Sequence, residues 1–173
     1  DIVAIGPETQ VIENLVVGDP ARPDLTARRM VVELGVGWQG PEVRRVRIEG
    51  ARLFGSYRGG TFSLGALDPL IFTDSKEPPR LPAIDVALVD ARAVFESDYG
   101  AVGIKLEGAG RLDDGFAGTL AVAAPGIGVE GCRAERATLY GKLATASGAP
   151  KLDGPLRLGG VKCGGATLAR ADI

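Results

Sequence analysis

The stretch MVVELGVGW (residues 30–38) places an apolar side chain at every second position. The side chains on one side of this extended chain are Met30, Val32, Leu34, Val36 and Trp38. A period of two over nine residues is typical of a β-strand with one buried face. The stretch therefore predicts a strand whose apolar face is covered by another part of the protein or by a ligand.

The same alternation recurs along the chain, in about ten short segments. Val46 and Ile48 alternate with charged residues, and the runs at 102–106 and 116–122 behave in the same way. The chain contains 26 Gly and 11 Pro, which interrupt helices. Asp114-Gly115, between two alternating runs, is a strong hairpin signal. We predict an all-β fold: an antiparallel, meandering sheet, strongly curved into an open apolar groove of taco-like shape, with little or no helix.

Two similar stretches lie 40 residues apart, ARLFGSYRGG at 51–60 and ARAVFESDYG at 91–100. The first predicts a hairpin with strands at 51–57 and 61–65, and each copy is expected to add a pair of strands to the sheet. Other echoes, such as IEGARL and VEGCRA, recur at uneven spacing, which argues against a solenoid of fixed period. The alternation slips by one residue at Gly50, which predicts a bulge or bend there.

The domain organisation is expected to be a single continuous β-sheet segment over residues 1–173. The charged, Pro-rich stretch TDSKEPPRLP (73–82) is predicted to be a loop that joins two sub-blocks, 1–72 and 83–173. A domain of this length usually buries roughly 70% of its unfolded surface. The chain does not begin with Met, so we expect it to be a fragment of a longer protein.

The composition argues against catalysis, cofactors, metals and nucleic acid. The chain has no His, which removes the commonest general base and metal ligand. No GxGxxG or P-loop pattern precedes a helix, and Asp113-Asp114 adjoins a glycine in a predicted turn. The 20 basic and 22 acidic residues give a net charge of −2, which provides no field that would attract nucleic acid.

Three further residues carry specific expectations. Arg44 has the phase of Val46 and Ile48, so it could stand at the rim of the apolar face and bind a phosphate. Cys132 and Cys163 fit no metal or redox motif. They are either joined in a disulfide, in an oxidising compartment, or are two buried free thiols.

The predicted apolar face needs a cover, which can be a second sheet, a helix or a ligand. No helix is predicted. The choice therefore lies between a closed sandwich or barrel and an open trough that holds an apolar molecule.

The order of the strand patterns resembles a known family. IENLVVGDPARPDLTARRMVVEL (12–34), VRRVRIEGARLFGSYRGGTFSLGALDPL (43–70) and the run from Glu96 to Leu143 are similar to AsmA-like bacterial envelope proteins, in particular the YdbH branch of the AsmA/TamB/YdbH group. The resemblance implies a periplasmic β-groove that carries phospholipids between the inner and outer membranes. It also implies a parent protein anchored in the inner membrane, a possible periplasmic or outer-membrane protein partner, and a compartment that permits a disulfide.

We therefore expect a non-enzymatic segment that conducts phospholipid or another acyl-chain lipid, with Arg44 at the head-group rim. The expected groove lining comprises Met30, Val32, Leu34, Trp38, Val46, Ile48, Val102, Ile104, Leu106, Phe116, Leu120 and Val122. The alternative is a structural or adhesive β-sandwich or solenoid module of the cell envelope, with a self-filled core and no ligand.

Overall fold

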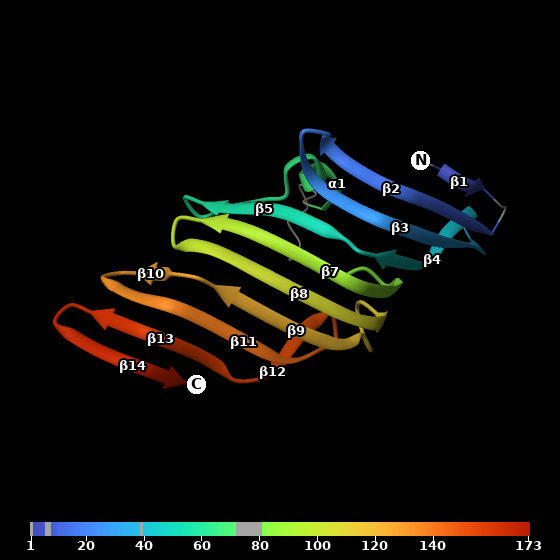
Figure 1. Ribbon diagram of the computed structural model, residues 1–173. Coiled ribbons are helices and arrows are strands. Elements are labelled where there is room, and N and C mark those ends of the chain that lie inside the picture. The colour runs from blue at the N-terminus through green and yellow to red at the C-terminus, as the bar shows by residue number, and fades with distance from the viewer. Residues whose placement is uncertain (1, 6–7, 39, 72–80) are drawn as a thin grey trace.

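The computed structural model describes residues 2–5, 8–38, 40–71 and 81–173, and its strands form one sheet of fourteen (Figure 1). The strands are β1 (Ile2–Ile5), β2 (Thr9–Asp19), β3 (Arg22–Gly37), β4 (Gly40–Glu49), β5 (Arg52–Arg58), β6 (Thr61–Ser63), β7 (Asp85–Ser97), β8 (Gly100–Arg111), β9 (Ala117–Ala124), β10 (Ile127–Val129), β11 (Cys132–Ala146), β12 (Ala149–Asp153), β13 (Leu156–Cys163) and β14 (Ala166–Asp172). A 3-10 turn, η1 (Gly65–Leu67), and one helical turn, α1 (Asp68–Ile71), follow β6. The all-β prediction is confirmed.

The main path across the sheet is β1-β2-β3-β4-β7-β8-β9-β11-β13-β14. Most neighbours are antiparallel and joined by short turns, as predicted. The exception is β7, which runs parallel to both β4 and β5. A purely antiparallel meander is therefore wrong at this point. A parallel neighbour requires a crossover, and the chain makes it after β6, through η1 and α1. The predicted loop 73–82 lies mostly outside the described residues.

The 40-residue echo is explained by this parallel pairing. β5 and β7 lie in register, so that each residue faces the residue 40 positions later, from Arg52 opposite Arg92 to Tyr57 opposite Ser97. The two copies are therefore neighbouring strands, and each begins a hairpin: β5 with β6 and β7 with β8. The predicted pairs of strands are confirmed.

The strand β3 keeps its apolar residues on one side because its alternation of inward and outward residues shifts by one position. We call such a shift a change of phase. Ala27 is buried and Met30 is half-buried, while Arg28 and Arg29 between them are both exposed. The spacing between inward residues is thus three at this point and two elsewhere. Without the change, every residue beyond Arg28 would point to the opposite side of the sheet.

Neighbouring strands change phase at the same level, along what we call the phase line: Asn14, Arg28, Gly50 and Asp90. Three of these residues have positive φ, 52° at Asn14, 66° at Gly50 and 50° at Asp90. Asn14 of β2 and Arg28 of β3 both lie between the register pairs Glu13–Arg29 and Leu15–Ala27. The Gly50 N–H donates to the carbonyl of Val89, at 2.8 Å. The bend predicted at Gly50 is therefore part of a feature that crosses β2, β3, the β4–β5 junction and β7.

The sheet exposes much more surface than a compact domain would. A compact monomer of this size exposes about 8,000 Å², whereas the chain exposes 11,495 Å². It buries about 55% of its unfolded surface, less than the 70% expected of a compact domain. The buried side chains are mostly alanines, and Phe116 is the largest side chain that is fully buried among the described residues. A single layer of strands has this property because most side chains have neighbours within the layer and no second sheet above them in the described part of the chain.

Candidate functional site: the apolar face

One side of the sheet carries a continuous apolar surface, which we call the apolar face. Residues directly opposite each other on neighbouring strands point to the same side. The register of the strands therefore traces a row across eight of them. From β2 to β13 this row runs through Val17, Leu25, Leu53, Ala93, Ile104, Val122, Leu139 and Leu156.

A second row crosses β3, β4, β7, β8, β9 and β11 on the other side of the phase line. Its members are Met30, Ile48, Leu88, Gly108, Gly118 and Leu143. The two rows lie on the same side of the sheet because β3, the β4–β5 junction and β7 change phase between them, while β8, β9 and β11 alternate without interruption over the same span. The phase line thus converts two apolar patches that would face opposite ways into one face.

The register places most of the predicted lining residues on this face. They are Met30, Val32, Leu34, Val46, Ile48, Val102, Ile104, Leu106, Leu120 and Val122, all half-buried, together with the fully buried Phe116. The expected lining left out Leu25, Leu53, Leu88, Ala93, Phe95, Leu139, Leu143 and Leu156, which share the face. The sequence signal for a change of phase is a spacing of three between inward residues. In the sequence, this spacing was recognised only at Gly50.

Trp38 and Arg44 lie elsewhere than the sequence predicted. Trp38 follows the last residue of β3, in the turn before β4, and is fully exposed. The register of β3 with β4 shifts so that Val43 takes the place opposite Leu34. Arg44 is therefore an extra residue in a bulge.

The bulge turns the Arg44 side chain to the charged side of the sheet. Its guanidinium occupies the space that a side chain at Gly35 would take. It lies 3.7 Å from the carboxylate of Glu42. The side of the sheet assigned to Arg44 from the sequence is thus wrong. One extra residue in a strand moves the side chains that follow it to the opposite side from the one that regular alternation predicts.

Phe116 forms the densest part of the apolar face. It is 1% exposed. Its ring reaches the position where Gly108 lacks a side chain. Its main-chain N–H donates to the hydroxyl of Thr145, at 3.0 Å, and that hydroxyl donates to the carbonyl of Arg111, at 3.3 Å. The glycine leaves room for an aromatic ring in a layer that has no second sheet to receive it.

Aromatic side chains gather beyond the other end of the face, near the β5–β6 turn. The rings of Phe62 and Phe95 lie 5.3 Å apart, and those of Tyr57 and Tyr99 lie 6.4 Å apart. Phe95 and the buried Leu64 occupy the space above Gly55. The segment after β6 therefore packs on this end of the sheet.

The opposite side of the sheet is charged, and we call it the charged face. Ion pairs cross it between neighbouring strands or along one strand, such as Arg45–Glu33 at 3.5 Å, Arg58–Glu96 at 2.7 Å and Lys105–Glu107 at 2.9 Å. The Arg47 guanidinium, which donates to Glu49, lowers the pKa of that carboxyl from its ordinary value. Exposed pairs of this kind contribute little stability. They mark the side of the sheet that faces water.

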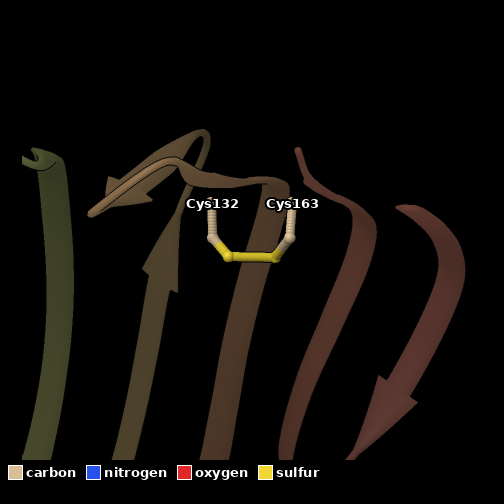
Figure 2. Close-up of a disulfide and its surroundings, with 2 residues drawn as sticks. All are labelled: Cys132 and Cys163. Carbon is tan, nitrogen blue, oxygen red and sulfur yellow. A yellow bond between two sulfur atoms is a disulfide. The ribbon is translucent and has the colours of Figure 1, made fainter. Parts of the chain in front are cut away.

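Cys132 and Cys163 form a disulfide between β11 and β13 (Figure 2). The two residues lie directly opposite each other at the ends of these strands, and 31 positions separate them in sequence. Of the two alternatives that the sequence left open, the structure adopts the disulfide. A bond of this type persists in oxidising compartments.

Two other features are absent from the described part of the chain. There, no three His, Cys, Asp or Glu side chains gather closely enough to hold a metal ion. Among the same residues, no helix has the length and apolar character needed to cross a membrane.

Comparison with known proteins gives one match. The family model described as YdbH-like, intermembrane phospholipid transport protein YdbH, matches residues 1–172. No curated protein and no solved structure matched the chain. The family match covers the whole sheet, including every strand of the apolar face.

Proposed function

Because the chain belongs to the YdbH-like family of intermembrane phospholipid transport proteins, we propose that its apolar face holds the acyl chains of phospholipids on their way between two membranes. In this proposal the sheet is one segment of a longer periplasmic groove, and the parent protein is anchored in the inner membrane. The segment binds and guides lipid and performs no chemistry.

The observation that carries the proposal is the open apolar face of a single-layer sheet. The chain exposes about 3,500 Å² more than a compact monomer would. Leaving an apolar surface of several hundred Å² in water is unusual for a monomer and is typical of interaction surfaces. Acyl chains would cover it with a gain of about 0.8 kcal/mol for each buried CH₂ group.

The distribution of charge supports a lipid rather than a polar solute as the occupant. The rows of the apolar face consist of apolar residues and glycine, while the ion pairs lie on the charged face. Such a surface offers dispersion contacts and no hydrogen bonds. An acyl chain needs only those contacts, and a long uniform face lets it slide without meeting a strongly favoured position.

The rival function, a structural or adhesive module without ligand, requires a core that the protein fills by itself. The strands of the described residues belong to one sheet, and large fully buried side chains are limited to Phe116 there. A self-filled sandwich would bury leucines and isoleucines between two layers. The present arrangement favours the groove.

Lipid extraction from the purified protein tests the proposal. We expect wild-type protein to carry phospholipid, and Leu120→Glu to lose it, because a carboxylate on the apolar face is costly next to acyl chains. Ile104→Glu and Leu34→Glu are expected to behave alike. The matched control is Ala123→Glu, which adds the same charge to β9 on the exposed side and should keep its lipid.

Circular dichroism shows whether the variants keep their strands. If folded Leu120→Glu protein retains as much lipid as Ala123→Glu, the apolar face is not the lipid site. If wild-type protein contains no lipid and a second copy covers the face, the proposed function is wrong for this segment.

A further inference from the structure

The charged face carries a cluster of arginines over β11, β13 and β14 that the lipid proposal does not use. Arg136, Gly159 and Arg170 lie directly opposite one another across these three strands. Arg157 stands on the middle strand, two residues before Gly159. Neighbouring strands are about 4.8 Å apart, so the two outer arginines flank the glycine at about 10 Å from each other.

A second phase change widens this part of the charged face. Ala134 and Ala137 of β11 are buried, whereas Glu135 and Arg136 between them are exposed. On β13 the corresponding residues are Gly159 and Gly160, and Gly160 has a φ of 62°. Two consecutive glycines of β13 thus lie on the charged face, at a place where regular alternation would leave one residue.

The result is a depression with a glycine floor and basic walls. Its volume is about 430 Å³, and Arg136, Arg157 and Arg170 line it together with Thr138. A methyl group added at Gly159 would lie 3.8 Å from a terminal nitrogen of Arg136. The Arg136 side chain therefore leans over the glycine, into the space from which a side chain is missing.

Asp172 is the one acidic side chain that the three arginines contact among the described residues. Arg170 donates to both of its carboxylate oxygens, at 3.2 and 2.8 Å. Arg157 lies 3.9 Å from it. Arg136 has no ion-pair partner in the described part of the chain, since the neighbouring Glu135 pairs with Lys162, at 2.8 Å. Three guanidinium groups thus face one carboxylate, which leaves an excess positive charge over the glycine floor.

We infer that this depression binds a phosphate group. Guanidinium groups bind tetrahedral phosphate by pairs of parallel hydrogen bonds, and arginine is the residue best suited to this. Arg136 of β11 and Arg170 of β14, on either side of Gly159, and Arg157 of the middle strand can donate to the oxygens of one phosphate above Gly159. The hydroxyl of Thr138 adds a neutral donor at the wall. We call these residues, Arg136, Thr138, Arg157, Gly159 and Arg170, the arginine cradle.

The arginine cradle lies on the opposite side of the sheet from the apolar face and does not depend on it. A phosphate could come from a lipid head group at a membrane surface or from a soluble anion. The shared chemistry is a phosphate with at least two free oxygens. The two sources differ in whether the phosphate is part of a surface.

Equilibrium dialysis of full-length protein against radiolabelled inorganic phosphate, at low ionic strength, tests the inference. We expect Arg136→Gln to weaken binding by at least about tenfold, because it removes a charge-assisted hydrogen bond to the phosphate. Gly159→Val should weaken it as strongly, by filling the floor without changing any charge. The matched control, Gly103→Val, adds the same side chain to the charged face of β8, where the nearest atom is 3.7 Å away.

The variant Asp172→Asn is expected to bind phosphate more tightly, and a misfolded protein would not show such a gain in affinity. It releases Arg157 and Arg170 and should tighten phosphate binding severalfold. Equal binding by wild-type, Arg136→Gln and Gly159→Val proteins would overturn the inference, as would an unchanged affinity in Asp172→Asn.

Flotation with vesicles identifies the source of the phosphate. Binding to phosphatidylglycerol vesicles that is lost in Gly159→Val supports a lipid head group. Binding of inorganic phosphate without binding to these vesicles supports a soluble anion. Loss of co-purified lipid in Leu120→Glu with normal phosphate binding would separate the two sites, whereas failure of phosphate binding alone would leave the apolar face as the sole functional surface.

Discussion

The guanidinium group of Arg52 binds Asp90 twice: one nitrogen lies 2.9 Å from its carboxylate and another donates to its main-chain carbonyl, at 2.7 Å. Arg92, directly opposite Arg52, also reaches the carboxylate, at 3.3 Å. Asp90 sits on the phase line with a φ of 50°. The two copies of the 40-residue echo are thus tied together at the residue where the strand changes phase.

The hydrogen bond from Arg52 lowers the pKa of Asp90 below its ordinary value of 3.8. A carboxyl with a lowered pKa stabilises the fold above its unfolded-state pKa and loses that contribution as the pH falls through the folded-state value. We therefore expect the free energy of unfolding to decrease below about pH 4. In Asp90→Asn this part of the decrease should be absent, and the protein should be less stable at pH 7.

Denaturation by urea at pH 7 and at pH 3 measures this difference. Asp153→Asn, at an exposed residue of β12, is the control and should match wild type at pH 7. An Asp90→Asn protein with the stability of wild type at pH 7 would show that the bonds to Arg52 and Arg92 do not stabilise the phase line.

Gly50 is expected to tolerate no side chain. Its φ is 66°, and a methyl group there would collide with the side chain of Arg28. The left-handed conformation and the overlap together predict a loss of about 2–4 kcal/mol in Gly50→Ala. Gly59→Ala has a similar φ, 56°, and open space around it, so it should lose about 1 kcal/mol. Equal losses in chemical denaturation would mean that Arg28 does not restrict the phase line.

Phe116 should be the most sensitive large side chain of the apolar face. Replacing it by Ala removes a fully buried ring and leaves a cavity above Gly108, so we expect a loss of about 3–5 kcal/mol. Phe54→Ala, at a ring that is 44% exposed, should cost about 1 kcal/mol or less. Thermal or urea denaturation compares the two. A small effect of Phe116→Ala would show that the single layer relaxes to fill the space.

The disulfide between Cys132 and Cys163 closes a loop that includes β11, β12 and β13. We expect the double variant Cys132→Ser/Cys163→Ser to be less stable by about 2–4 kcal/mol. Mass spectrometry of the native protein should show the loss of two hydrogens relative to the reduced chain. Reduction of wild-type protein should reproduce the stability of the double variant. Two thiols that react with an alkylating reagent in unreduced protein would contradict the bond.

The sequence predicted the local elements and the apolar character of one face, because alternation, turn glycines and hairpins depend on a few neighbouring residues. Met30, Val32 and Leu34 lie where the period of two places them. The in-register pairing of residues 51–57 with 91–97 was visible only as an echo. Its meaning depends on the chain after β6, which carries no turn signal that fixes the direction of the next strand.

The errors at the site come from shifts of one residue. A single extra residue in β4 turned Arg44 to the charged face, and the end of β3 placed Trp38 in a turn. Nothing in the pair Arg44-Arg45 says which of the two is the extra residue. Like Arg28-Arg29 and Glu135-Arg136, the pair does carry a more general signal: two charged residues in succession between two inward residues, here Val43 and Val46. Spacings of three within alternating runs therefore mark the points where a strand changes phase, at Arg28-Arg29, Arg44-Arg45 and Glu135-Arg136.

The single-layer construction determines how the protein responds to damage. Each strand of the described residues is hydrogen-bonded only to the strands beside it in the sheet, and no second layer of strands in that part of the chain connects remote strands across a common core. Stability is then close to a sum of nearest-neighbour terms, as in a repeat protein. A disrupted strand weakens the strands paired with it, of which β11 has four, and leaves distant ones intact, so cooperativity extends over a few strands at a time. The same locality means that hairpins could be gained or lost during evolution, changing the length of the sheet without any redesign of the remainder.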